Sequence, residues 1–219
     1  MNALTQQIYL LSPPGGLFDL SVVCNLFPDL SPGARNILVH RAIESGEAQQ
    51  LKRGLYVLSK PFRKIHPHPF AVAPMLYAPS TISLESALSY HGLIPEAVYQ
   101  TTSTTLKRSL SFETSLGDFV FQTVPSSNRL AGVESIKLDK HFWAFVATPF
   151  KAIADLIYLR KEVDWTTDGM AFLTESMPIE SDDLFAMSLA VADEIIESIR
   201  NKRTQEYMRQ LSEELGNKN

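Results

Sequence analysis

The segment between residues 60 and 79 limits most strongly what this chain can fold into, because it contains five prolines. Proline fixes its own φ and has no backbone N–H, so prolines at this density disfavour a regular helix and favour an extended connector. We therefore expect two domains, at residues 1–60 and 80–219, joined by a proline-rich connector at 61–79. The prolines are Pro61, Pro67, Pro69, Pro74 and Pro79.

The first part of the chain has the pattern of three short helices. Apolar spacing predicts helices over residues 4–11 and 18–27. The third helix is the best marked, because Ser31 is placed as its N-cap and Pro32 occupies its first helical position. Gly46 then provides a left-handed stop. The expected buried stripe of this helix is Leu38, Val39, Ala42 and Ile43.

A β-hairpin is predicted directly after the third helix. Residues 47–59 read as two short strands about a turn at Arg53 and Gly54, where glycine supplies the positive φ of a tight turn. Three short helices followed by a hairpin with a basic tip are the plan of a winged helix-turn-helix domain. We assign this plan to residues 1–60.

The remainder has a mixed pattern and completes the predicted fold class. This class is α+β, with a larger mixed α/β domain after the winged helix and a helical region at the C-terminal end. Turn signals and alternating apolar residues separate its elements. The predicted helices are 83–90, 151–160 and a long region over 182–215; the predicted strands are 98–104, 111–114, 118–124, 135–138 and 142–147.

The composition excludes several classes of protein. Apolar residues make up 45% of the chain and charged residues 20%, which is typical of a soluble globular protein. The single cysteine, Cys24, excludes an internal disulfide and is expected to be buried. The sequence shows no apolar run of membrane-spanning length and no signal-peptide pattern, so we expect a cytoplasmic protein without a membrane partner.

The charge is distributed unevenly along the chain. Residues 1–70 contain seven Lys or Arg and four Asp or Glu, a balance of +3, whereas residues 71–219 contain thirteen and twenty, a balance of −7. A basic first third on an acidic remainder is typical of a DNA-facing domain attached to a body that does not bind DNA.

The polar face of the third helix and the hairpin tip contain the candidate DNA-binding residues. Asn and Arg read base edges in the major groove by bidentate hydrogen bonds, and cations at a wing meet the phosphate backbone. Glu44 is discordant, because a carboxylate repels phosphate. A solvated face that binds nothing is the alternative interpretation for each residue. We expect base reading by Asn36, His40 and Arg41, and phosphate contacts by Arg35, Lys52 and Arg53.

No familiar enzyme motif is present, and we expect neither a catalytic site nor a cofactor. The sequence contains no GxxxxGK[ST], GxGxxG or GxSxG pattern. His66 and His68 lack a spaced third ligand, so we expect no metal site. Lys151 and Asp155 stand at i, i+4 spacing and are expected to form an ordinary ion pair within one helix.

Four blocks of the sequence carry a resemblance when they are taken in order: RNILVHRAIESGEAQQLKRGLYVLS (35–59), SLESALSYHGLIPEAVYQTTSTT (83–105), GDFVFQTV (117–124) and VATPFKAIADLIYLR (146–160). Together they resemble AbiE-type (AbiEi-like) antitoxins. This family comprises transcriptional regulators paired with a nucleotidyltransferase-like toxin. The resemblance extends to about residue 160, and Phe150 departs from it, since many relatives would have Glu there.

The resemblance implies a toxin–antitoxin system with a role in phage defence. Its implied activities are repression of the chain's own promoter through double-stranded DNA, and neutralisation of a cognate toxin that depends on the second domain. Two alternatives remain open. The winged helix could bind a protein instead of DNA, or the chain could be an enzyme of an unrecognised class. Charge reversal at Lys52 and Arg53 would separate DNA binding from protein binding.

Overall fold

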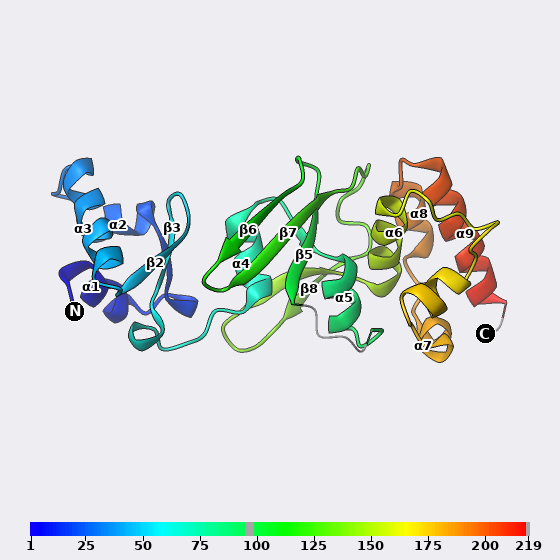
Figure 1. The fold of residues 1–219 in the computed structure, drawn as a ribbon, viewed down its shortest axis with the longest axis horizontal. Coiled ribbons are helices and arrows are strands. Elements are labelled where there is room, and N and C mark those ends of the chain that lie inside the picture. The colour runs from blue at the N-terminus through cyan, green and yellow to red at the C-terminus, as the bar shows by residue number, and fades with distance from the viewer. Residues whose placement is uncertain (95–98, 218–219) are drawn as a thin grey trace.

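The computed structural model describes residues 1–94 and 99–217. Figure 1 shows an elongated molecule with three parts in a row: an N-terminal unit, a six-stranded sheet in the middle, and a group of helices at the C-terminal end. The predicted α+β class is confirmed, because helices accompany two separate sheets. Within the described ranges, no helix has both the length and the apolar composition that a membrane crossing requires.

The N-terminal unit contains the three predicted helices and the predicted hairpin, together with a strand that we did not predict. A three-stranded antiparallel sheet has the order β1-β3-β2. A 3-10 turn (Pro14–Gly16) leads into β1. The elements are α1 (Ala3–Leu11), β1 (Leu17–Asp19), α2 (Leu20–Leu26), α3 (Pro32–Glu44), β2 (Ala48–Lys52) and β3 (Leu55–Leu58).

Strand β1 occupies the beginning of the segment 18–27 that we predicted as one helix. Phe18 pairs with Tyr56 of β3, and their rings stack with centroids 5.5 Å apart. The helix begins only after Asp19, whose carboxylate accepts the N–H of Val22 at 3.0 Å and caps α2. Cys24 on α2 is exposed, so the expectation that it is buried was wrong. Short-range periodicity could not predict a strand that depends on pairing with β3.

The proline-rich segment is not the extended connector that we predicted. Lys60–Phe62 form a 3-10 turn, and Pro69–Leu76 form helix α4. Pro69 stands at the first helical position, where a missing N–H costs nothing, and Nδ1 of His68 accepts the N–H of Phe70 at 3.1 Å. Val72, Ala73 and Leu76 are buried, and this burial offsets the backbone bond that Pro74 removes within the helix.

The middle part is built on a mixed sheet of order β6-β7-β5-β4-β9-β8. Strand β4 is a short central strand that the sequence did not predict; it pairs antiparallel with β5 and parallel with β9. The predicted strand 98–104 is observed from residue 100, and Val98 lies outside the described residues. The elements are β4 (Thr81–Ile82), α5 (Leu84–Tyr90), β5 (Gln100–Thr105), β6 (Leu110–Thr114), β7 (Gly117–Thr123), β8 (Val133–Lys137), β9 (Trp143–Ala147) and α6 (Pro149–Leu159).

The predicted helical region 182–215 is divided into three helices. These are α7 (Ser181–Ala186), α8 (Ala192–Ser198) and α9 (Lys202–Gly216), preceded by a π-helical turn (Phe172–Ser176). The chain leaves helical geometry at Ile199, which bridges to Ser126 of the middle part. Asn201 then caps α9 by accepting the N–H of Thr204 at 3.0 Å. The tertiary contact with the loop after β7 therefore decides where α8 ends.

Candidate nucleic-acid interface

Helix α3 has the boundaries that the sequence predicted. The Ser31 hydroxyl accepts the N–H of Ala34 at 3.3 Å, Pro32 is the first helical residue, and Gly46 has a φ of 70° just past the end. Val39 and Ala42 are buried against the N-terminal core, with Leu38 and Ile43 partly buried beside them. These buried residues fix the orientation of α3, so the opposite side of the helix faces solvent.

The solvent face of α3 brings three predicted residues together. Asn36, His40 and Arg41 are all exposed. Nε2 of His40 lies 3.1 Å from a carboxylate oxygen of Glu44, and both side chains are more than half exposed. An exposed ion pair of this kind contributes little to stability, so Glu44 holds the His40 side chain only weakly. Ile37 lies on the same face and is 52% exposed, so the face is amphipathic.

Arg35, which we expected to contact phosphate, is hydrogen-bonded within the protein. Its Nε donates to the carbonyl of Phe27 at 2.9 Å, and a terminal nitrogen donates to the carbonyl of Pro28 at 2.6 Å. The other terminal nitrogen lies 3.4 Å from Sγ of Cys24. The guanidinium therefore binds the C-terminal end of α2, where helix carbonyls lack internal partners, and joins α2 to α3.

Replacing Arg35 with methionine tests this structural role. We expect the free energy of unfolding to fall by about 1–3 kcal/mol, because charged hydrogen bonds to two carbonyls are lost. The measurement is urea unfolding of the wild type and of the variants Arg35→Met and Arg41→Met. Arg41→Met should leave stability nearly unchanged. Equal stability of all three proteins would contradict the structural role of Arg35.

The two cations that we predicted at the hairpin tip have different surroundings. Nζ of Lys52 donates to the carbonyl of Leu76 at 2.7 Å, so Lys52 contacts α4 and does not project from the tip. Partial burial is the main cause that lowers the pKa of Lys52, and Lys107 adds repulsion. Arg53 is exposed at the turn, where Gly54 has a φ of 81°. Arg53 alone therefore remains available at the tip to a ligand.

The hairpin is also the place where the N-terminal unit meets the rest of the protein. Leu51, Leu55 and Val57 belong to the large core that includes α4 and the six-stranded sheet. The helices α1 and α3 pack on the other side of the three-stranded sheet, in a separate core with Phe18 and Leu58. Figure 1 accordingly places α3 at the outer end of the molecule and the hairpin toward the middle part.

The histidines of the proline-rich segment have partners within the protein. Nδ1 of His66 lies 3.2 Å from the guanidinium of Arg63, and His68 caps α4. Burial lowers the pKa of both imidazoles; for His66 the nearby Arg63 adds to this effect. In the part of the chain that the structure describes, no three His, Cys, Asp or Glu residues are grouped to hold a metal ion.

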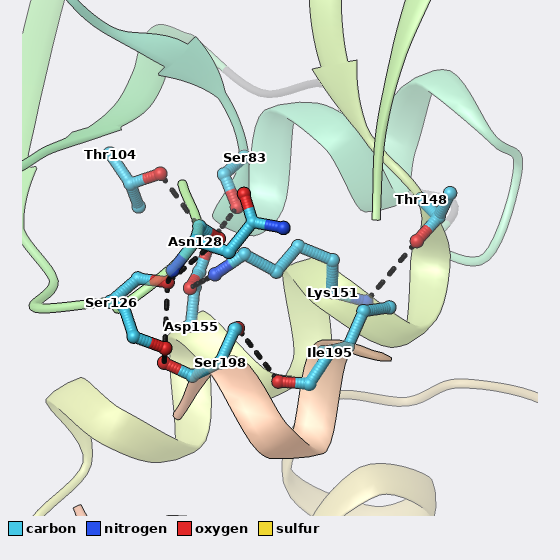
Figure 2. A network of polar contacts seen from close by, with 10 residues as sticks. Ser83, Thr104, Ser126, Asn128, Thr148, Lys151, Asp155, Ile195 and Ser198 are labelled. Atoms are coloured by element: carbon cyan, nitrogen blue, oxygen red, sulfur yellow. Dashed lines mark hydrogen bonds and ion pairs between the residues drawn. The ribbon is translucent and has the colours of Figure 1, made fainter. Parts of the chain in front are cut away.

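Lys151 and Asp155 form the predicted i, i+4 ion pair, but the pair is buried (Figure 2). Lys151 is 6% exposed and Asp155 is 1% exposed. The other carboxylate oxygen of Asp155 accepts the Ser83 hydroxyl at 2.7 Å, and Thr104 Oγ1 lies 3.4 Å away. Spacing alone predicted the pair; its burial depends on β4, β5 and α5 packing over α6. Ser83 itself is fully buried, so it is inaccessible as a nucleophile.

Two aromatic side chains of the predicted strand 142–147 are exposed. Phe142 is buried, but Trp143 is 59% exposed and Phe145 is 56% exposed. Both project from the same face of β9, opposite to Ala144 and Val146. The sequence shows that neighbouring side chains of this strand alternate between two faces. It does not show which face of the strand the rest of the protein covers.

Neither the scan against protein-family models nor the search of curated proteins found a match to this chain.

Proposed function

We propose that this protein is a DNA-binding transcriptional repressor whose N-terminal unit is a winged helix-turn-helix domain. The supporting observation is the element order α1-β1-α2-α3-β2-β3 with the sheet order β1-β3-β2. In this arrangement α3 takes the place of the recognition helix that enters the major groove. The unpredicted strand β1 strengthens the proposal, because it adds the third strand of such a domain.

The chemistry of the exposed surface agrees with this role. Asn36 and Arg41 are side chains that make bidentate contacts to adenine and guanine, and His40 lies between them on α3. Arg53 at the hairpin tip is placed to meet a phosphate or a minor groove. Because Arg35 and Lys52 are bound to backbone carbonyls, their proposed role changes from phosphate contact to positioning of α3 and of the hairpin.

The antitoxin role is part of the same proposal and is supported by the resemblance of the four sequence blocks to AbiE-type antitoxins. Two of these blocks form the units described above: residues 35–59 comprise most of α3 with the hairpin, and residues 146–160 contain α6 with its buried ion pair. We propose that the N-terminal unit represses the chain's own promoter and that the remainder serves to neutralise a nucleotidyltransferase-like toxin.

Fluorescence anisotropy tests the DNA-binding proposal. The purified protein is titrated onto a duplex from upstream of its own gene and onto a scrambled duplex, at about 50 and about 200 mM salt, where the electrostatic term makes affinity fall steeply. We expect tighter binding to the native duplex at both salt concentrations. Absence of binding at both concentrations would refute the proposal, and equal weak binding to both duplexes would refute sequence-specific repression.

A protein-binding winged helix is the second candidate, and Ile37 is the observation that favours it. An exposed isoleucine on a helix face contributes to protein contacts more readily than to a phosphate backbone. Ile37→Ser should then weaken a complex with the toxin and leave DNA affinity unchanged, which co-purification and anisotropy measure separately.

A further inference from the structure

A pocket lies over the buried Lys151–Asp155 pair. It is formed by the beginning of β4, the end of β5, the loop after β7 and the first turn of α6. The pocket is small, with a cavity volume of about 30 Å³, and it opens to solvent. The residues that line it include hydroxyl groups and two cations but no carboxylate. Its polar lining includes Ser80, Ser126, Arg129 and Lys151.

Lys151 has more hydrogen-bond donors than the protein satisfies. An ammonium group has three N–H donors, and among the described residues only Asp155 accepts from it. Lys151 is nevertheless 6% exposed, and buried donors are normally paired. Asp155 is itself held by the Ser83 hydroxyl (Figure 2). Lys151 lines the pocket, so a ligand bound there is placed to supply the remaining acceptors.

Two further donors border the same pocket. The Ser80 hydroxyl is buried and has no hydrogen-bond partner among the described residues. Arg129 is exposed at the pocket and forms no ion pair within the described ranges. The Ser126 hydroxyl, by contrast, already contacts the carbonyls of Asn128 at 2.8 Å and Ser198 at 3.3 Å. Three kinds of donor therefore line the pocket: the Lys151 ammonium, which Asp155 satisfies only in part, the exposed Arg129 guanidinium and the unpartnered Ser80 hydroxyl.

We propose that this pocket binds a phosphate group. Its donors come from three separate segments, namely residue 80 before β4, residue 129 in the loop after β7 and residue 151 on α6. A tetrahedral dianion offers several acceptor oxygens in different directions, and charge-assisted hydrogen bonds from Lys and Arg favour it. The phosphate group belongs to inorganic phosphate or to a nucleotide. This inference goes beyond the proposed function and does not depend on DNA binding.

Isothermal titration calorimetry of the full-length protein tests the proposal, with inorganic phosphate, a nucleoside monophosphate and a nucleoside triphosphate as separate ligands at matched ionic strength. The variants are Arg129→Gln and Ser80→Ala. Neither side chain has a hydrogen bond or ion pair with another described residue, so both variants should fold. Arg41→Gln on α3 is the matched control for loss of one exposed positive charge.

We expect saturable binding of at least one of these ligands to the wild type and to Arg41→Gln. Arg129→Gln should weaken it about tenfold, and Ser80→Ala about threefold to tenfold, as expected for loss of one charged and one neutral hydrogen bond. Tighter binding of a nucleotide than of inorganic phosphate would identify the nucleotide as the source. No saturable binding of any of the three ligands, or binding that both pocket variants leave unchanged, would overturn the proposal.

Discussion

Replacement of Lys151 with methionine is expected to lower the free energy of unfolding by about 3–5 kcal/mol, because it leaves the Asp155 carboxylate buried without its cation. The Ser83 hydroxyl still donates to Asp155 in this variant, but one neutral hydrogen bond does not compensate for a buried charge. Urea unfolding at neutral pH, followed by circular dichroism, measures the change.

Two further variants make this result specific. Lys161→Met removes an exposed cation just beyond the same helix and should change stability by less than about 0.5 kcal/mol. The double variant Lys151→Met, Asp155→Leu removes both charges and should recover at least about half of the loss, since apolar replacement of a buried pair is often close to neutral. A loss at Lys151→Met as small as that at Lys161→Met would show that water reaches the pair.

The second large effect is expected from reversing the charge of Arg41 and Arg53 together. Both residues are exposed, and one lies on α3 and the other at the hairpin tip. If both face DNA, the double variant Arg41→Glu, Arg53→Glu should lose affinity on the order of 100-fold, because each contact contributes about 1–3 kcal/mol. The slope of log affinity against log salt should also become shallower by about two contacts.

Lys161→Glu combined with Lys202→Glu is the matched control for this experiment. It changes the net charge by the same amount, at exposed positions in the C-terminal half of the chain. We expect this control to bind DNA within about threefold of the wild type, because charges beyond a Debye length are largely screened at the higher salt concentration. Equal losses in the two double variants would contradict the assignment of α3 and the hairpin tip as the DNA-binding surface.

The elements with local signals were predictable from the sequence. Helix α3 has its start signal in Ser31 and Pro32 and its stop signal in Gly46, and the hairpin turn has Gly54, so both appear where predicted. Elements whose stability depends on distant partners were missed. Strand β1 needs β3, and α4 exists despite Pro74 because the large core covers it.

The residues of the candidate interface also divide into those with a local signal and those whose contacts depend on distant parts of the chain. The buried stripe of α3 determines which side faces solvent, so Asn36, His40 and Arg41 were correctly placed on one exposed face. The side chains of Arg35 and Lys52 were assigned to phosphate, but in the fold they bind backbone carbonyls of residues 27, 28 and 76. A long flexible cation takes whichever acceptor the fold brings near, and spacing along the chain does not reveal that acceptor.

The sequence by itself determined the α+β class, the limits of most helices and strands, and the solvent face of α3. These features depend on apolar periodicity and on caps and turns, which act over a few residues. Only the tertiary structure decided that the proline-rich segment folds into a helix, that the Lys151–Asp155 pair is buried, and that Lys151, Arg129 and Ser80 line one pocket. Burial and the pairing of charges arise from residues far apart in the chain, so local pattern does not contain them.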